Sequence, residues 1–209
     1  MSKTHDHLEI EVKFFIADAG QIQRRLEALG VTAGPEVFET NVRYENSDHS
    51  FKAQDQLLRL RRDESCRLTF KSRPQKDDRE CKVLNELEVQ VDDCDTMDRL
   101  LQALGYHPVQ IYEKTRRTYI GFEVEFCLDV MPFGTFLEIE GSKPRIKEAA
   151  RRLGLAWEDR ILANYLEIFE GLRAKYKLPF KDVTFTDFEK HPVDVVPLLP
   201  MLRAGANVD

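Results

Sequence analysis

Long apolar runs are missing from this sequence. No stretch approaches the roughly 18 apolar residues that a membrane-spanning helix requires, so we expect no membrane partner. The opening residues, MSKTHDHLEIEVKF, contain no apolar core followed by a cleavage site, and we expect no secretory signal there. Both absences favour an intracellular globular protein.

Cysteine is scarce as well. The four cysteines lie far apart and form no C-x-x-C pair: Cys66, Cys81, Cys94 and Cys127. Such spacing is poor support for a disulfide framework or a zinc knuckle. It is typical of free thiols in a reducing cytoplasm, where we place the protein.

A basic surplus is also absent. Lys and Arg number 31 against 37 Asp and Glu, which gives a formal charge of −6. Because nucleic-acid-binding proteins usually carry a positive surplus, we expect no nucleic acid partner. Apolar residues make up 42% of the 209 residues, too many for a disordered chain, and no internal repeat is visible. The length suits one domain with a small appendage.

The sequence does contain strict alternation of polar and apolar residues, which predicts β-strands. At 8–16, L-E-I-E-V-K-F-F-I places Glu9, Glu11 and Lys13 on one face and apolar side chains on the other. A similar extended pattern marks seven further segments: 36–45, 57–61, 67–73, 84–91, 108–120, 122–130 and 135–140. About eight strands are therefore predicted.

Helical spacing of apolar residues marks four more segments: 18–29, 95–104, 144–153 and 159–176. The first starts at a capping Asp18 and stops at Gly30. From Pro179 onward the periodicity breaks down, so we predict no regular structure for the last thirty or so residues. We accordingly divide the chain into a domain at 1–176 and a C-terminal tail at 177–209.

Ionisable side chains share one phase of nearly every predicted strand. Nine are carboxylates: Glu9, Glu11, Glu86, Glu88, Glu123, Glu125, Asp129, Glu138 and Glu140. Eight are cations: Lys13, Arg59, Arg61, Arg67, Lys71, Arg73, Lys114 and Arg116. A single strand of this kind usually has a solvated outer face, and that interpretation stays open for each strand taken alone.

Several charged strands together favour a different arrangement. Since the helices must cover the apolar faces, the charged faces would point at one another, as in a closed barrel with a polar lumen. Arg and Lys rows suit phosphates, whereas carboxylate pairs suit hard divalent cations that also bridge phosphate oxygens. The pattern therefore predicts a metal–polyphosphate site inside an α+β protein with an eight-stranded antiparallel barrel and helices outside.

Six motifs, in this order, resemble the CYTH family, also called triphosphate tunnel metalloenzymes. They are E-x-E-x-K at 9–13, L-L-R-L-R at 57–61, L-T-F-K at 68–71, N-E-L-E at 85–88, Y-E-K-T-R at 112–116 and L-D-V-M-P-F-G-T-F-L-E-I-E at 128–140. The family includes class IV adenylate cyclases, thiamine triphosphatases and inorganic triphosphatases. The resemblance covers roughly residues 7–170.

The resemblance implies roles for particular residues of the tunnel. Substrate phosphates would be bound by Lys13, Arg59, Arg61, Lys71, Lys82, Lys114 and Arg116. Mg²⁺ or Mn²⁺ would be bound by Glu9, Glu11, Glu88, Asp129, Glu138 and Glu140. The catalytic residues would be Lys13, Glu9 and Glu11, with Lys13 a phosphate ligand first and a base second.

Hydrolysis of a triphosphate, inorganic or organic, is the function we favour. The alternative is an adenylate cyclase, which would release pyrophosphate from ATP. Class IV cyclases resemble H-F-x-x-x-x-E-x-E-x-K near the start of the chain. His5 and His7 do not have that spacing to the E-x-E-x-K motif, which weakens the cyclase alternative. A non-catalytic polyphosphate-binding module is a third interpretation. As partners we expect a small triphosphate-containing molecule, with a homodimer left open.

Overall fold

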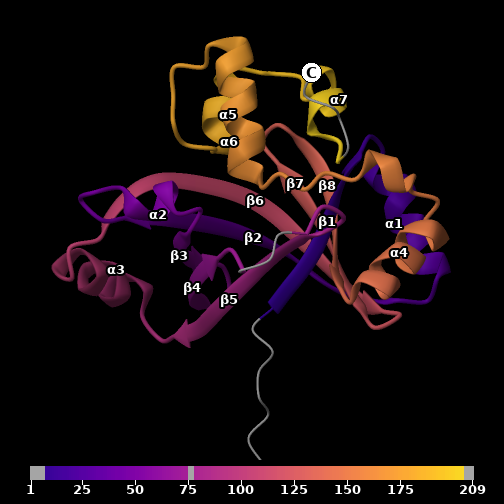
Figure 1. Cartoon of the computed structure of the whole chain (residues 1–209), viewed down its shortest axis with the longest axis horizontal. Coiled ribbons are helices and arrows are strands. Elements are labelled where there is room, and N and C mark those ends of the chain that lie inside the picture. The colour runs from indigo at the N-terminus through magenta and orange to yellow at the C-terminus, as the bar shows by residue number, and fades with distance from the viewer. Residues whose placement is uncertain (1–7, 75–77, 205–209) are drawn as a thin grey trace, which may run out of the picture.

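A computed structural model describes residues 8–74 and 78–204, and the structural statements below refer to these residues. Eight antiparallel strands close into a barrel in the order β1, β5, β4, β3, β2, β6, β7, β8, which confirms the predicted fold (Figure 1). The strands are β1 (Leu8–Ile16), β2 (Thr32–Glu45), β3 (Leu57–Arg62), β4 (Cys66–Ser72), β5 (Lys82–Val91), β6 (His107–Gly121), β7 (Val124–Met131) and β8 (Gly134–Gly141).

The strand register brings opposite charges together on the inner face. Side chains of directly paired residues lie on the same side of a sheet. Lys13 of β1 pairs with Glu138 of β8, and Lys71 of β4 pairs with Glu86 of β5. The alternation read from the sequence thus becomes a lumen in which cations and carboxylates are neighbours.

The helices lie outside the barrel over three clusters of buried apolar residues. They are α1 (Ala19–Ala28), α2 (Ser50–Ala53), α3 (Cys94–Ala103), α4 (Lys143–Arg152), α5 (Tyr165–Tyr176), α6 (Phe185–Lys190) and α7 (Leu199–Leu202), with 3₁₀ turns η1 (Trp157–Asp159) and η2 (Val196–Leu198). In Figure 1, α1 and α4 lie at one end, α3 at the other, and α5 to α7 over one side. No described helix is both long and apolar enough to cross a bilayer.

The helix predicted over 159–176 begins only at Tyr165. Ile161 is extended instead, because its backbone N–H and C=O are hydrogen-bonded to Lys13 at 2.7 and 3.1 Å. Asn164 then starts α5 with a capping box, in which its side chain accepts from the N–H of Glu167 and the Glu167 side chain accepts from the N–H of Asn164. Asp159 belongs to the 3₁₀ turn η1, and the pairing of Ile161 with β1 overrides the apolar periodicity between that turn and Tyr165.

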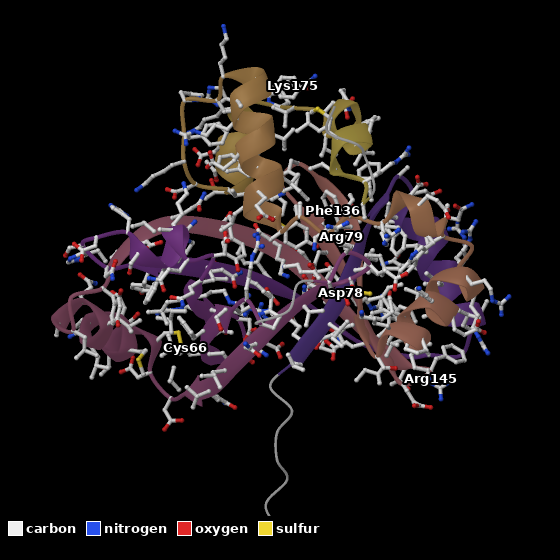
Figure 2. All side chains as sticks on the ribbon, in the orientation of Figure 1. Cys66, Asp78, Arg79, Phe136, Arg145 and Lys175 are labelled. Carbon is white, nitrogen blue, oxygen red and sulfur yellow. A yellow bond between two sulfur atoms is a disulfide. The ribbon has the colours of Figure 1, made fainter. Side chains whose placement is uncertain are left out.

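The segment after α5 has more regular structure than we predicted for 180–209. Val183 is hydrogen-bonded to Ile111 and Glu113 of β6, and Phe188 of α6 is buried in the cluster that also contains Phe136 of the barrel (Figure 2). Gly171 of α5 allows η2 to approach closely, since a methyl group there would lie 2.9 Å from Leu198. Packing against the barrel, which is not visible as periodicity, orders these short turns.

The expectation of four reduced cysteines is wrong for one pair. Cys66, at the start of β4, forms a disulfide with Cys94, the first residue of α3, and their Cα atoms are 5.6 Å apart (Figure 2). Cys81 and Cys127 are buried free thiols. The two bonded cysteines are 28 residues apart and belong to no motif. Strand pairing brings them together, because Cys66 pairs with Val91 at the end of β5, and α3 begins three residues later at Cys94.

Reducing this disulfide should lower thermal stability without abolishing the fold. A cross-link of this loop length contributes about 2–4 kcal/mol in typical proteins. We expect dithiothreitol to lower the melting temperature by several degrees, measured by circular dichroism. A C66S/C94S double variant should melt at the lower temperature with or without reductant. Equal melting temperatures for the oxidised and reduced wild type would contradict a stabilising disulfide.

Candidate active site in the barrel lumen

The lumen contains a cavity of about 1330 Å³. All seven predicted phosphate-binding residues line it, from five different strands: Lys13, Arg59, Arg61, Lys71, Lys82, Lys114 and Arg116. Five of the six predicted metal ligands line it too: Glu9, Glu11, Glu88, Glu138 and Glu140. Period-two geometry placed these side chains on the inner face, and barrel closure made them converge.

Lys13 and Arg116 converge on a single carboxylate. The Nζ of Lys13 lies 2.6 Å from Glu138, and Nη2 of Arg116 lies 2.5 Å from the other Glu138 oxygen. Burial alone would raise the pKa of Glu138, but Lys13 and Arg116 hold it well below its usual range. The Lys13 side chain is only 2% exposed. A ligand phosphate could take the place of Glu138 beside both cations.

A second set of ion pairs joins β1, β4 and β5. Lys71 lies 2.5 Å from both Glu9 and Glu86, and Lys82 lies 2.7 Å from Glu11. Burial would raise the pKa of Glu11, yet Lys82 lowers it to about 2. Glu9 behaves differently, because burial and then Glu11 raise its pKa to about 7.

Glu140 is the carboxylate with the least compensation. It pairs across the sheet with Glu11 on one side and Glu125 on the other, so three strands present acids side by side. Burial raises its pKa to about 8, with further contributions from Glu9, Glu125 and Glu11. Within the described part of the chain it has no ion-pair partner.

Arg59 and Arg61 of β3 are held by polar groups of the neighbouring strands β2 and β4 and of β6. Arg59 donates to the Tyr112 hydroxyl at 3.2 Å and to Thr69 at 3.0 Å. Arg61 donates to Asn41 at 3.1 Å, and its Nε lies 3.3 Å from Glu39. Their guanidinium groups are therefore fixed before any ligand binds.

Two predicted carboxylates do not take the expected place. Asp129 is fully buried behind Lys114 and Arg116 and does not line the cavity. Glu123, which the alternation put in phase with the others, lies in the β6–β7 turn with positive φ and pairs with Arg145 on the surface. The turn breaks the alternation at Glu123, whereas Glu125 on β7 does line the cavity.

Glu39 and Tyr165 are site residues that the motifs missed. Glu39 of β2 is buried 3.3 Å from Arg61 and 3.6 Å from Lys114. Burial would raise its pKa, but Lys114 and then Arg61 lower it to about 2. Alternation over 36–45 was the only signal for Glu39. Tyr165 had no signal, because it lies on a helix beyond every motif.

The carboxylates of the lumen are suitable ligands for a divalent metal, but they do not surround a single point. Among residues 8–74 and 78–204, no three Asp, Glu, His or Cys side chains already form a metal-binding group. Instead, Glu9 is ion-paired with Lys71, and Glu11 is ion-paired with Lys82. The adjacent acids Glu11, Glu140 and Glu125 nevertheless provide hard oxygen donors whose mutual repulsion a cation would relieve.

Comparisons with known proteins agree with this geometry. The CYTH domain pattern matches residues 7–159. A Methanocaldococcus jannaschii protein, whose name marks it as a candidate adenylate cyclase, is 28% identical over 166 residues, covering 79% of this chain and 89% of the relative. A Pyrococcus horikoshii structure is 31% identical with a TM-score of 0.64, covering 75% of this chain and 96% of its own.

A more distant structure shares the fold alone. It comes from Hippeastrum, where it is described as a candidate adenylyl cyclase with a dominant triphosphatase activity. It is 19% identical with a TM-score of 0.57, covering 78% of this chain and 95% of its own. The closed charged tunnel, together with the match over residues 7–159, defines the class: this chain belongs to the CYTH family. His5 and His7 lie outside the described residues.

The crowding of acids around Glu140 predicts a pH-dependent cost to stability. In the unfolded chain this carboxyl ionises near 4.5, whereas the fold raises its pKa to about 8. Folding therefore favours the protonated form, and this contribution is lost as the pH rises through that interval. We expect Glu140→Gln to melt like the wild type near pH 4.5 and at a higher temperature at pH 8.5, measured in EDTA.

Glu123→Gln is the matched control, because Glu123 is an exposed carboxylate near the same strand end. It should show no gain that grows with pH. A constant difference between Glu140→Gln and the wild type at all pH values would show that Glu140 is not destabilised by its charge.

Proposed function

We propose that this CYTH protein is a divalent-metal-dependent triphosphatase. Its substrate would be inorganic tripolyphosphate or an organic triphosphate bound inside the tunnel. The observation that carries the proposal is the convergence of seven Lys and Arg side chains on one closed lumen that also contains several acids. A ligand with several negative charges and affinity for a divalent cation would satisfy both sets.

Phosphate binding would work by exchange of partners. In the ligand-free lumen, Glu138 compensates Lys13 and Arg116, and Glu9 with Glu86 compensates Lys71. Phosphate oxygens would replace these carboxylates beside the cations and form charge-assisted hydrogen bonds. Since the cations are already buried, much of their desolvation cost is met during folding rather than on binding.

We assign the metal to Glu9, Glu11 and Glu140, with Glu138, whose charge acts on Glu11, close to them. Glu88, the remaining lining acid of the predicted set, accepts from Thr69 at 2.8 Å and lies 3.6 Å from Arg59. Mg²⁺ or Mn²⁺ bound by Glu9, Glu11 and Glu140 would neutralise charge on the phosphate oxygens and favour attack by water. The chain's own contribution is to align the phosphate group and to hold positive charge where the transition state becomes more negative.

Lys13 is placed to bind a negatively charged group. Its Nζ lies 2.6 Å from a Glu138 carboxylate oxygen and 4.3 Å from the centroid of the Tyr165 ring, so it already contacts an anion in the lumen. This supports its predicted first role as a phosphate ligand. Of the three predicted catalytic residues, Glu9 and Glu11 would then act by binding the metal.

An adenylate cyclase is the second candidate. The 28% identical archaeal relative, named as a candidate of that kind, favours it. Cyclisation also requires that adenine and ribose be held so that the 3′-oxygen faces the α-phosphorus. Three amide side chains line the cavity: Gln56, Gln110 and Asn164. The Gln110 oxygen accepts from Arg43 and its nitrogen donates to the Lys181 carbonyl, and the Asn164 side chain caps α5, so Gln56 would be left to contact adenine. Hydrolysis requires no such contact, which supports the hydrolase over the cyclase.

Cytoplasmic location and a homodimer also remain predictions. A reducing cytoplasm would tend to cleave the Cys66–Cys94 bond, so the redox state of this pair in cell extracts is a direct check on location. Sedimentation of the purified chain would give its oligomeric state.

A substrate panel decides between the candidate functions. We expect orthophosphate release from tripolyphosphate with Mg²⁺ or Mn²⁺, faster than any formation of cyclic AMP from ATP, and loss of turnover in excess EDTA. Products would be resolved by ion-exchange chromatography. Cyclic AMP and pyrophosphate as main products, with tripolyphosphate intact, would establish the cyclase. Tight binding without turnover of either substrate would establish a binding module.

Substitution of neighbouring arginines tests whether the lumen binds phosphate. Arg61 lines the cavity, whereas Arg62 is exposed on the outside beside Asp95. Arg61→Ala should weaken tripolyphosphate binding about 10- to 100-fold, because a hydrogen bond to a charged group contributes about 1.5–3 kcal/mol. Arg62→Ala should bind like the wild type in calorimetry. Equal affinity for both variants would mean that this strand does not contact the ligand.

A further inference from the structure

We propose that Tyr165 and Asp129 form a positioning pair that holds Lys13 and Lys114 in the lumen, and that Asp129 serves this purpose in place of metal ligation. Tyr165 lies on α5, beyond the CYTH match at 7–159. The site is therefore completed by a residue from outside the matched region. The proposal depends on the proposed function only for the identity of the ligand that the lysines bind.

The Tyr165 ring lies against both ammonium groups. Nζ of Lys13 is 4.3 Å from the ring centroid, and Nζ of Lys114 is 5.5 Å from it. Tyr165 is 7% exposed, so these cation–π contacts are largely shielded from water, where they are stronger than at a surface. The ring face thus restricts where each ammonium group can lie.

The Tyr165 hydroxyl connects the ring to a buried acid. It donates to Oδ2 of Asp129 at 2.8 Å. The same carboxylate accepts from Lys114 at 2.9 Å and from Nε and Nη2 of Arg116, both at 2.6 Å. Three of these four donors are at Oδ2 and one, Nε of Arg116, is at Oδ1, so both oxygens are already engaged by donors.

Asp129 is also cut off from the cavity. It is 0% exposed and does not contribute to the cavity lining, whereas Lys114 and Arg116 do. To ligate a cation in the lumen, it would have to release donors that carry two positive charges. Its position instead suits a carboxylate that orients the phosphate ligands from behind, as outer-shell acids orient the inner ligands of other sites.

The start of α5 is fixed relative to Lys13 itself. Ile161, four residues before Tyr165, exchanges two backbone hydrogen bonds with Lys13, at 2.7 and 3.1 Å. Asn164 then caps the helix and sets the direction in which the Tyr165 side chain leaves it. The backbone of Ile161 and the ring and hydroxyl of Tyr165 therefore contact one group of neighbours, namely Lys13, Lys114 and Asp129.

Three tyrosine variants test the pair. Tyr165→Phe removes only the hydroxyl, Tyr165→Leu removes the ring face as well, and Tyr176→Phe is the matched control. Tyr176 is on the same helix and donates to the Asp194 carbonyl at 2.8 Å, away from the lumen. Affinity for tripolyphosphate would be measured by calorimetry in EDTA, so that no metal contributes. Acetylation of Lys13 by limiting acetic anhydride, followed by mass spectrometry, would report its confinement without any ligand.

We expect Tyr165→Leu to weaken metal-free binding about tenfold and Tyr165→Phe about threefold, with faster acetylation of Lys13 in Tyr165→Leu. Tyr176→Phe should match the wild type in both measurements. Wild-type affinity and labelling in Tyr165→Leu would overturn the proposal, as would equal losses in Tyr176→Phe. If the wild type does not bind tripolyphosphate, the proposed function fails, and Lys13 labelling alone decides the positioning role.

Asp129→Asn separates positioning from metal ligation. A positioning carboxylate should affect metal-free binding and leave the Mg²⁺ concentration for half-maximal activity within about twofold of the wild type. A rise of tenfold or more in that concentration, with metal-free binding intact, would show that Asp129 ligates the metal. Should Asp129→Asn not fold, the Mg²⁺ concentration for half-maximal activity of Tyr165→Phe gives the same distinction. The hydroxyl that this substitution removes donates to Asp129 in the wild type.

Discussion

Compensation of buried charge is the constraint on which this structure depends. Closing the sheet into a barrel removes its edges but takes more than a dozen ionisable side chains out of bulk water. An isolated buried charge would be very costly, so each cation must lie beside a carboxylate on the same inner face. The antiparallel register provides this, for example where Lys13 of β1 pairs with Glu138 of β8.

Charge compensation in the lumen is uneven, and the excess acids lie together in one place. Cations are matched by acids almost throughout, but acids are left in excess where β7, β8 and β1 place Glu125, Glu140 and Glu11 side by side. A fold optimised for stability alone would not retain such a cluster. Under the proposed function, a metal–polyphosphate complex would complement these acids together with the lumen cations, and the repulsion among the acids would lie at the site itself.

The outer layers keep this lumen in shape from three directions. α1 and α4 cover β7 and β8, α3 is bonded to β4 through Cys66 and Cys94, and α5 reaches inward to the lumen. Through α5, the Tyr165 hydroxyl reaches Asp129 behind the lumen cations. The segment that follows, including Phe188 and Leu198, packs under α5 and holds it against the barrel.

Local periodicity determined much of this protein. Because side chains alternate along a strand, the pattern alone determines which residues share a face, and the strand count and the lumen cations could be predicted from it. The motif at 9–13 and the five motifs that follow it in the chain indicate the CYTH family. What the sequence determined is therefore the inner face and its chemistry, since both depend on neighbours in the chain.

Tertiary structure decided what depends on distant neighbours. It paired Cys66 with Cys94, turned Glu123 to the surface, and kept residues before Tyr165 extended by pairing Ile161 with Lys13. It also put Asp129 behind the cations although its strand phase matches that of the lining acids. Strand phase gives the side of the sheet but not the depth within the barrel. Depth depends on strand tilt and register and on the helix α5, whose Tyr165 contacts Asp129, and these exist only once the chain has folded.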